Sequence, residues 1–243
     1  NEPAFKKDDE HRLMIDISRG VLGIYEGIKD IHIGPNIIVA DFPLRWTVKG
    51  MSKLYKNGIN NVVTSQRVIP SHLMDPKIKN RSRLFYLMAN IEASLFKGDN
   101  NWALMLDPDG FIAEGSGDNF FIIKDGELIS PEGTNMLRGI TRKYIMEELA
   151  PQIDLPVKEK YIELFDAYES DEAFICATPF CMIPVTSINS VSIGNGKPGK
   201  YYKSLIKQWS LNMGVDIIEQ IKNWDNDVKK NINKNKISPY KFK

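Results

Sequence analysis

The stretch Asp107–Arg142, DPDGFIAEGSGDNFFIIKDGELISPEGTNMLRGITR, predicts two consecutive β-hairpins followed by a loop and the start of a helix. Apolar runs flank the dipeptides Asp109–Gly110 and Asp125–Gly126, and Asp-Gly between such runs is typical of tight hairpin turns. Between the two turns, Glu114 is followed by the small residues Gly115–Gly117 inside strand-forming sequence. Glycines there indicate a bulge or a close approach of another group to the backbone. The stretch therefore places one carboxylate within a predicted meander of strands.

The end of the same stretch has the features of an anion site. Gly139 and Ile140 precede Thr141, which we expect to be the N-cap of the following helix, because threonine hydroxyls accept backbone N–H groups at that position. Backbone N–H groups at a helix N-terminus can bind phosphate. A flat cofactor with a ring nitrogen and a phosphate would use Glu114 at one end and this loop at the other.

The composition is that of an ordinary globular protein. The 243 residues are 42% hydrophobic and 26% charged, with a formal net charge of +1, so there is no general attraction to nucleic acid or to a membrane surface. Cys176 and Cys181 are too few for a disulfide framework and indicate a reducing, cytoplasmic setting. The three histidines, His11, His32 and His72, lie far apart in the sequence, and we expect no metal site. No apolar run reaches membrane-spanning length, and we expect neither a signal peptide nor membrane association.

The other segments mix helix and strand patterns, which predicts an α+β fold. We expect helices over residues 11–25, 82–97, 142–149, 162–168, 201–209 and 215–224, and strands over residues 37–42, 61–65, 102–106, 155–159, 172–177 and 182–188. The helix from Ser82 has the clearest pattern, with an apolar row at helical spacing made of Leu84, Leu87, Met88, Ile91 and Leu95. We expect a small domain over residues 1–45, a large domain over residues 46–226 and a mobile basic tail over residues 227–243.

Lys79 lies just before the predicted Ser82 helix, beside Arg81 and Arg83. The positive end of that helix and both arginines disfavour a charged amine, and an uncharged lysine can attack a carbonyl and form an imine. The alternative is a solvated basic turn in which Lys77 and Lys79 are merely exposed. On local sequence alone the solvated turn is the commoner case, because perturbed groups mark functional sites only statistically.

The other candidates also have ordinary structural interpretations. Glu114 could end a strand and face water, which is the usual environment of glutamate, or it could keep a pyridine nitrogen protonated. Thr141 is more often a simple helix cap than a phosphate ligand. Thr178 follows the predicted strand over residues 172–177, and a hydroxyl at the end of that strand could also reach a phosphate.

Taken together, the motifs resemble the class IV aminotransferases, the pyridoxal-phosphate enzymes that include branched-chain and D-amino acid aminotransferases. The resemblance runs over residues 61–207 and rests on five ordered segments: Lys79 with Ser82–Leu84, the meander at 106–131, LRGITR at 137–142, DEAFICATPFCMIPV at 171–185 and IGNGKPG at 193–199. It implies fold type IV, with the remainder of a small α/β N-terminal domain, a larger domain built on a β-barrel-like sheet with flanking helices, and a homodimer. The family's opening segment is expected to be absent before Asn1.

The resemblance implies a role for each matching residue. Lys79 would form the internal aldimine with pyridoxal 5′-phosphate and then shuttle the proton; Lys77 is the rival, but the spacing to the later motifs favours Lys79. Glu114 would pair with the pyridine nitrogen, and Leu137 would pack under the ring. The phosphate would be bound by Ile140, Thr141, Thr178 and Arg12.

Three departures from the family pattern concern the phosphate and the substrate. The family's early histidine lies three residues before its arginine, whereas His11 adjoins Arg12. Branched-chain enzymes usually place Asn-Tyr where this chain has Arg83–Leu84. They also hold the substrate carboxylate partly by the backbone N–H after the threonine, and Pro179 has none to donate. An arginine would then have to pair with the carboxylate, and the candidates are Arg67, Arg83 and Arg138.

The activity implied by the resemblance is transfer of an amino group between an amino acid, first a branched-chain L-amino acid, and a 2-oxo acid. A D-amino acid or (R)-amine transaminase is the second interpretation, and an aminodeoxychorismate lyase-type enzyme with the same lysine is the third. From a different class, the lysine-rich tail after Asp227 suggests nucleic-acid binding. A solvated tail is commoner, and no interleaved aromatic residues support base stacking. We therefore expect small-molecule substrates and no nucleic acid.

Overall fold

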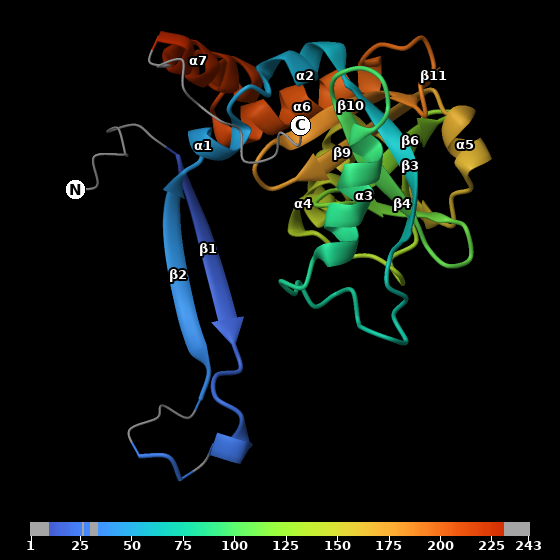
Figure 1. The fold of residues 1–243 in the computed structure, drawn as a ribbon. Coiled ribbons are helices and arrows are strands. Elements are labelled where there is room, and N and C mark those ends of the chain that lie inside the picture. The colour runs from blue at the N-terminus through green and yellow to red at the C-terminus, as the bar shows by residue number, and fades with distance from the viewer. Residues whose placement is uncertain (1–9, 26, 30–33, 231–243) are drawn as a thin grey trace. The chain divides into compact units, whose positions relative to one another are not determined.

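The computed structural model describes residues 10–25, 27–29 and 34–230, and much of the predicted basic tail lies outside these ranges. The chain forms two units, Asn1–Lys49 and Gly50–Lys243, which are described separately (Figure 1). Among the described residues, no helix combines the length and apolar character needed to cross a membrane.

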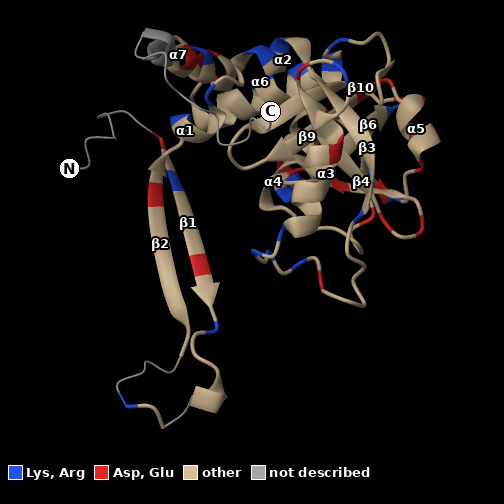
Figure 2. Cartoon of the chain, viewed as in Figure 1, with Lys and Arg blue, Asp and Glu red and all other residues tan. Residues whose placement is uncertain are grey.

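The N-terminal unit contains an antiparallel hairpin of β1 (His11–Ser18) and β2 (Asn36–Pro43), followed by the short helix α1 (Arg45–Val48). The helix predicted over residues 11–25 is therefore wrong over its first half, and η1 (Gly23–Tyr25) is one 3₁₀ turn. The segment HRLMIDIS also alternates apolar and polar residues with the period of a strand. Pairing with the segment NIIVADFP runs along the whole length of the strand and satisfies the backbone groups on the edge that faces β2. Figure 2 shows the two strands largely free of charge, and their Asp, Glu, Lys and Arg residues in the sequence are Arg12, Asp16 and Asp41.

The large unit is built around a closed ring of six strands. In order around the ring they are β10 (Cys181–Ile188), β3 (Ile59–Arg67), β4 (Asn101–Leu106), β5 (Ile112–Gly115), β6 (Asn119–Lys124) and β9 (Glu172–Ala177), which pairs back onto β10. The pairs β10–β3 and β3–β4 are parallel, and the other four pairs are antiparallel. Three further strands extend the sheet: β7 (Glu127–Pro131), β8 (Val157–Lys160) and β11 (Val191–Ser192).

The two hairpins predicted from Asp-Gly dipeptides are confirmed. Strands β4 and β5 are antiparallel across Asp109–Gly110, and β6 and β7 are antiparallel across Asp125–Gly126. Asp125 has φ +50° and Gly126 has φ +77°, the two positive values that a type I′ turn requires. Local turn chemistry therefore sets the register of β6 against β7.

The sequence FFII of β6 is a continuous apolar run because this strand is buried on both faces. Phe120, Phe121, Ile122 and Ile123 of β6 are all fully buried, so both faces of this strand are covered. Phe121 stacks on Phe174 of β9 with ring centroids 4.9 Å apart. This packing holds β6 and β9 together next to β5, the strand that carries Glu114.

Helices surround the barrel (Figure 1), namely α2 (Ser52–Asn57), α3 (Leu84–Ser94), α4 (Ile140–Tyr144) continued by η2 (Ile145–Leu149), η3 (Pro151–Ile153), α5 (Leu164–Tyr168), α6 (Lys200–Met213) and α7 (Ile217–Lys230). Asp225 on α7 accepts the backbone N–H groups of Gly50 at 2.6 Å and Ser52 at 3.0 Å. The end of the described chain is thereby tied to the start of the unit.

The apolar row that indicates α3 in the sequence is not the row that packs on the barrel. Leu84 and Leu95 are 69% and 79% exposed, whereas Ala89 and Ala93 are buried against the sheet. Phe85, four residues before Ala89, continues the packed row. The helix is apolar on more than one face, so its spacing predicts a helix without deciding its orientation. The small alanines allow α3 to lie close to β3 and β4.

Candidate active site

One cavity of about 380 Å³ opens at the ends of β5, β6 and β9. Six of the seven residues predicted to form the site line it: Lys79, Glu114, Leu137, Ile140, Thr141 and Thr178. The seventh, Arg12, lies on β1 in the N-terminal unit, where its Nη1 donates to Thr47 Oγ1 at 2.8 Å. The fold therefore brings residues from Lys79 to Thr178 together around one cavity.

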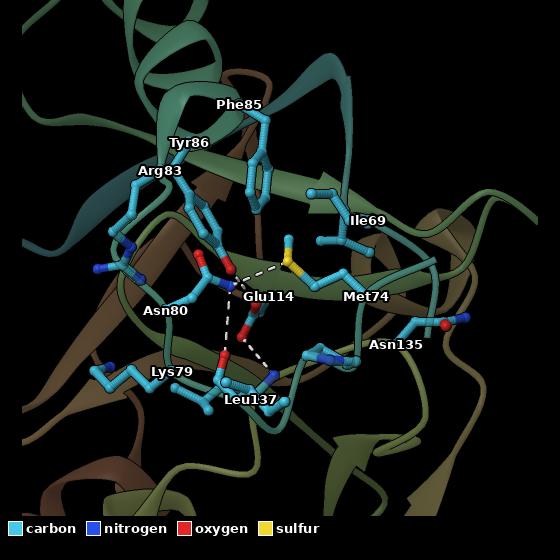
Figure 3. A pocket seen from close by; sticks show the side chains of 13 residues that line it. Ile69, Met74, Lys79, Asn80, Arg83, Phe85, Tyr86, Glu114, Asn135 and Leu137 are labelled. Atoms are coloured by element: carbon cyan, nitrogen blue, oxygen red, sulfur yellow. Dashed lines mark hydrogen bonds between the residues drawn. The ribbon is translucent and has the colours of Figure 1, made fainter. Parts of the chain in front are cut away.

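Glu114 is the buried acid of this cavity. It lies on β5, paired with Met105 of β4 and Asn119 of β6, and its residue is only 4% exposed. Its Oε1 accepts the Tyr86 hydroxyl at 2.7 Å, and its Oε2 accepts the Leu137 N–H at 3.1 Å (Figure 3). Burial raises the pKa of Glu114 to about 7, although both hydrogen bonds and the positive charges of Arg83 and Lys79 act in the opposite direction.

Two threonine hydroxyls that line the cavity lie close to each other. Thr141 Oγ1 and Thr178 Oγ1 are 3.3 Å apart, and they come from the start of α4 and the end of β9. Thr141 is not the N-cap as predicted, because the helix already begins at Ile140 and Gly139 holds the extended cap conformation. The hydroxyl of Thr141 therefore projects from within the first turn, towards Thr178.

The loop that joins these two ends is held by an asparagine. Asn119 Nδ2 donates to the Leu137 carbonyl at 2.8 Å. A Cβ at Gly139 would clash with Asn119 Oδ1, so glycine is the residue that permits this approach. Asn119 follows the Gly115–Gly117 segment, and it thus connects the meander to the loop that precedes α4.

Lys79 and Lys77 have different environments. Lys79 lines the cavity together with Arg83. Lys77 pairs with Asp75 at 3.4 Å and approaches the Thr134 carbonyl at 3.5 Å, and it does not line the cavity. Figure 3 shows Lys79 and Arg83 on the same side of Glu114. Of the two lysines left open by the sequence, Lys79 is the one beside the buried acid.

Two further residues of the site have no clear signal in the sequence. Asp118 in the β5–β6 turn is buried, and its Oδ1 has no hydrogen-bond partner among the described residues. Burial, and after it the nearby charge of Glu114, raises the pKa of Asp118 to about 8. Tyr86 projects from the first turn of α3 to reach Glu114, 28 residues further along the chain.

The three arginines considered for substrate binding also separate. Arg83 and Arg138 line the cavity, and Arg67 does not. Arg67 Nη1 instead donates to the carbonyl of Thr64 at 2.7 Å. Arg83 Nε is buried without a hydrogen-bond partner in the described part of the chain. Among the described residues, no cluster of His, Cys, Asp and Glu could hold a metal ion. The arrangement of one amine, two buried carboxyls, three hydroxyls and two cavity-lining guanidinium groups suits a small charged ligand.

Comparisons with known proteins identify the family of the chain. The family model described as amino-transferase class IV matches residues 3–188. A putative branched-chain-amino-acid aminotransferase of Methanocaldococcus jannaschii is 35% identical over 153 residues, covering 63% of this chain and 52% of that relative. The chain spans about half the length of the curated relatives it matches, the covered share being 52%, 36%, 39% and 59% in the first four.

Solved structures with the same fold match most of the chain. The branched-chain aminotransferase of Thermoproteus uzoniensis with norvaline has a TM-score of 0.70 and 25% identity, covering 88% of this chain and 68% of that chain. That of Thermobaculum terrenum in its PLP form has the same fold, with a TM-score of 0.70, 21% identity and 89% and 67% coverage. The expected fold type IV with its barrel-like sheet is confirmed. The chain belongs to the class IV aminotransferase family.

Proposed function

We propose that this chain binds pyridoxal 5′-phosphate in the cavity and acts in an aminotransferase. The reaction would move an amino group between an amino acid, first a branched-chain L-amino acid, and a 2-oxo acid. One observation carries the proposal: six residues that the resemblance assigns to the cofactor line the same cavity, including Lys79 beside Glu114 and the Thr141–Thr178 pair.

The residues of the cavity fit this cofactor in size and in chemistry. A volume of about 380 Å³ lies within the range of ligand pockets, roughly 300–1,000 Å³. Burial raises the pKa of Glu114 to about 7, and a protonated ring nitrogen beside it would favour the ionised carboxylate again. The Thr141 and Thr178 hydroxyls can donate to phosphate oxygens. Each charged or polar end of the ligand thus has a matching group.

Each residue has a separate task in this proposal. Pyridoxal phosphate, when bound, supplies the electron sink. Lys79 would hold it covalently, and its Nζ would carry a proton once the lysine is free. Glu114 would keep the ring nitrogen charged, and Leu137 would supply an apolar surface for the ring. The phosphate is assigned to Ile140, Thr141, Thr178 and Arg12, the last of these on the resemblance alone.

The test is to trap the lysine. The purified chain incubated with pyridoxal phosphate should gain an absorption band at the blue edge of the visible range and lose it on treatment with borohydride. Peptide mapping should find the reduced adduct on Lys79. Lys79→Ala should abolish both signals, and Lys77→Ala is the matched control that should retain them. An adduct on Lys77, or no adduct in the wild type, would refute the assignment.

The cavity-lining arginines favour a substrate with a carboxylate. Pro179 offers no N–H, whereas Arg83 and Arg138 both line the cavity and can pair with an anion. We therefore rank amino acids above (R)-amines. The measurement is kcat/KM for L-leucine, D-alanine and (R)-1-phenylethylamine in Arg83→Ala and Arg138→Ala, with Arg67→Ala as the control.

The kcat/KM for the amino acids should fall in at least one of the two cavity variants, and the kcat/KM for the amine should not. A preference for L-leucine that survives both substitutions would contradict the argument from Pro179. Release of pyruvate from aminodeoxychorismate, without nitrogen transfer, would instead establish the lyase.

We also infer a homodimer and a cytoplasmic setting for this enzyme. The resemblance supports the homodimer. The cytoplasmic setting is supported by Cys176 and Cys181, which are both free. Light scattering of the purified chain measures the first, and a monomer at working concentration would contradict it. Fractionation of cells that express the chain measures the second.

A further inference from the structure

We propose that Tyr86 is a positioning residue for Glu114, and that its hydroxyl fixes the carboxylate and holds it ionised towards the cavity. The part of this inference that concerns catalysis rests on the proposed function. The part that concerns the carboxylate rests on the contacts of this chain alone.

Two donors hold the two oxygens of Glu114. The Tyr86 hydroxyl donates to Oε1 at 2.7 Å, and the Leu137 N–H donates to Oε2 at 3.1 Å. Figure 3 shows Tyr86 and Leu137 approaching the carboxylate from different sides. Rotation of the carboxylate about its last torsion would break both bonds. Leu137 contributes a backbone group, so Tyr86 is the side chain through which this chain controls the carboxylate.

The ring of Tyr86 is itself held in place. The Arg83 guanidinium carbon lies 4.7 Å from its centroid, and the Phe85 ring centroid lies 4.0 Å away. The ring also packs against the buried cluster that contains Ala89 and Met105. A clamped ring presents its hydroxyl in one direction, so little side-chain entropy is lost when the hydrogen bond forms.

The groups around Glu114 make this hydroxyl important for its charge. Burial favours the neutral acid, and Asp118 adds a second buried carboxyl in the same cavity. Arg83 and Lys79 favour the ionised form, as does the hydrogen bond from Tyr86. Burial and the charge of Glu114 raise the pKa of Tyr86 well above its usual value. The hydroxyl therefore keeps its proton over the working pH range and remains a donor.

The test measures the ionisation of Glu114 directly. In the cofactor-free full chain labelled with ¹³C at glutamate carboxyls, the Glu114 resonance is assigned by its absence in Glu114→Gln. Tyr86→Phe should raise the measured pKa of Glu114 by about one to two units, the equivalent of one hydrogen bond to a charged group. Replacing residue 86 by 3,5-difluorotyrosine, a stronger donor, should lower it.

A matched control removes a hydroxyl elsewhere. Tyr168 accepts a hydrogen bond from Asn189 Nδ2 at 3.1 Å and does not line the cavity. Tyr168→Phe should leave the Glu114 titration unchanged. If the pKa of Glu114 were unchanged both in Tyr86→Phe and in the fluorinated chain, the inference would be overturned. The fluorinated chain keeps the tyrosine ring, so its effect on the pKa does not come from lost packing.

The consequence for catalysis is measured separately. With pyridoxal phosphate bound, Tyr86→Phe should retain the borohydride-trapped Lys79 adduct while the acidic limb of the kcat/KM profile moves to higher pH. A wild type that binds no pyridoxal phosphate would refute the proposed function, yet the titration of Glu114 would still decide the role of Tyr86. If Tyr86→Phe with bound pyridoxal phosphate kept the wild-type pH profile of kcat/KM, the role of Tyr86 would be restricted to the cofactor-free protein.

Discussion

Replacing Asp118 by asparagine should stabilise the cofactor-free chain at alkaline pH and leave it almost unchanged near pH 4. Asp118 is 8% exposed, and its Oδ1 has no hydrogen-bond partner among the described residues. A buried carboxylate with an unpaired oxygen is unfavourable when charged. The carboxyl therefore holds its proton in the folded state, and asparagine reproduces the shape of this neutral form.

The sign and size follow from the two pKa values. The pKa of Asp118 rises from 3.8 in the unfolded chain to about 8 in the folded protein, first because of burial and then because of Glu114. Between these values the unfolded chain binds fewer protons, so the free energy of unfolding falls as pH rises and levels off above pH 8. A shift of roughly four units sets an upper limit of about 5 kcal/mol on this loss. Asp118→Asn should remove that loss.

The assay is urea unfolding of the cofactor-free full chain at intervals from pH 4 to pH 9. The wild type and the variant should agree near pH 4 and then diverge steadily, the variant being more stable by several kcal/mol at pH 8. Glu114 remains in the variant and leaves a smaller decline, because its pKa is also raised, to about 7. Asp109→Asn, in an exposed turn, is the control. A constant difference between Asp118→Asn and wild type at every pH would refute the reasoning.

Three further predictions concern the cofactor and the fold. Thr141→Ala and Thr178→Ala should each weaken pyridoxal phosphate binding by about 1.5–3 kcal/mol, or roughly ten- to a hundred-fold in Kd by fluorescence titration; unchanged affinity in both would place the phosphate elsewhere. Glu114→Gln should bind the cofactor but slow the half-reaction in single-turnover experiments, and an unchanged rate would exclude it as the ring-nitrogen partner. Arg142 is 5% exposed, and its guanidinium donates to Ser130 Oγ at 2.8 Å and to the Pro131 carbonyl at 3.3 Å, so Arg142→Ala removes a donor from buried acceptors and should cost about 1–3 kcal/mol of unfolding free energy. Glu159→Gln should cost about 1 kcal/mol or less, because that side chain is 44% exposed and a glutamine oxygen can still accept from Arg142 Nη2, and equal costs would contradict this account.

Turn chemistry is the part of the fold that the sequence predicts best. The two Asp-Gly hairpins are confirmed because each turn is decided by the residues within it: Asp125–Gly126 forms a two-residue loop with positive φ at both positions, and Gly110 supplies the positive φ of the longer β4–β5 turn. The strand β6 is likewise evident from its continuous apolar run. By contrast, the segment His11–Ser18 fits both a helical and an alternating pattern. Its strand form is decided by β2, a partner that begins 18 residues later.

The orientation of α3 is another feature that local sequence leaves open. Rows through Leu84 and through Phe85 both have helical spacing, and the barrel surface selects the row with alanines at its centre, Ala89 and Ala93. This choice has a consequence for the site. Turning the alanine row towards β3 and β4 also directs Tyr86 to the buried carboxylate, so a packing preference of small side chains sets the position of a functional hydroxyl.

Glu114 has one property that the sequence predicts and another that only the structure explains. Its place between two hairpin turns is visible in the sequence, but its charge is not, because charge depends on groups from distant segments. Burial by the barrel pushes the carboxyl towards the neutral form, while Tyr86 of α3 and the Leu137 N–H push it back. These opposing effects leave the pKa near 7, so a cation placed against the carboxylate would decide its ionisation at neutral pH. The same balance makes Glu114 a weak anion alone and a strong partner for a protonated ring nitrogen, which is the property that the proposed cofactor requires.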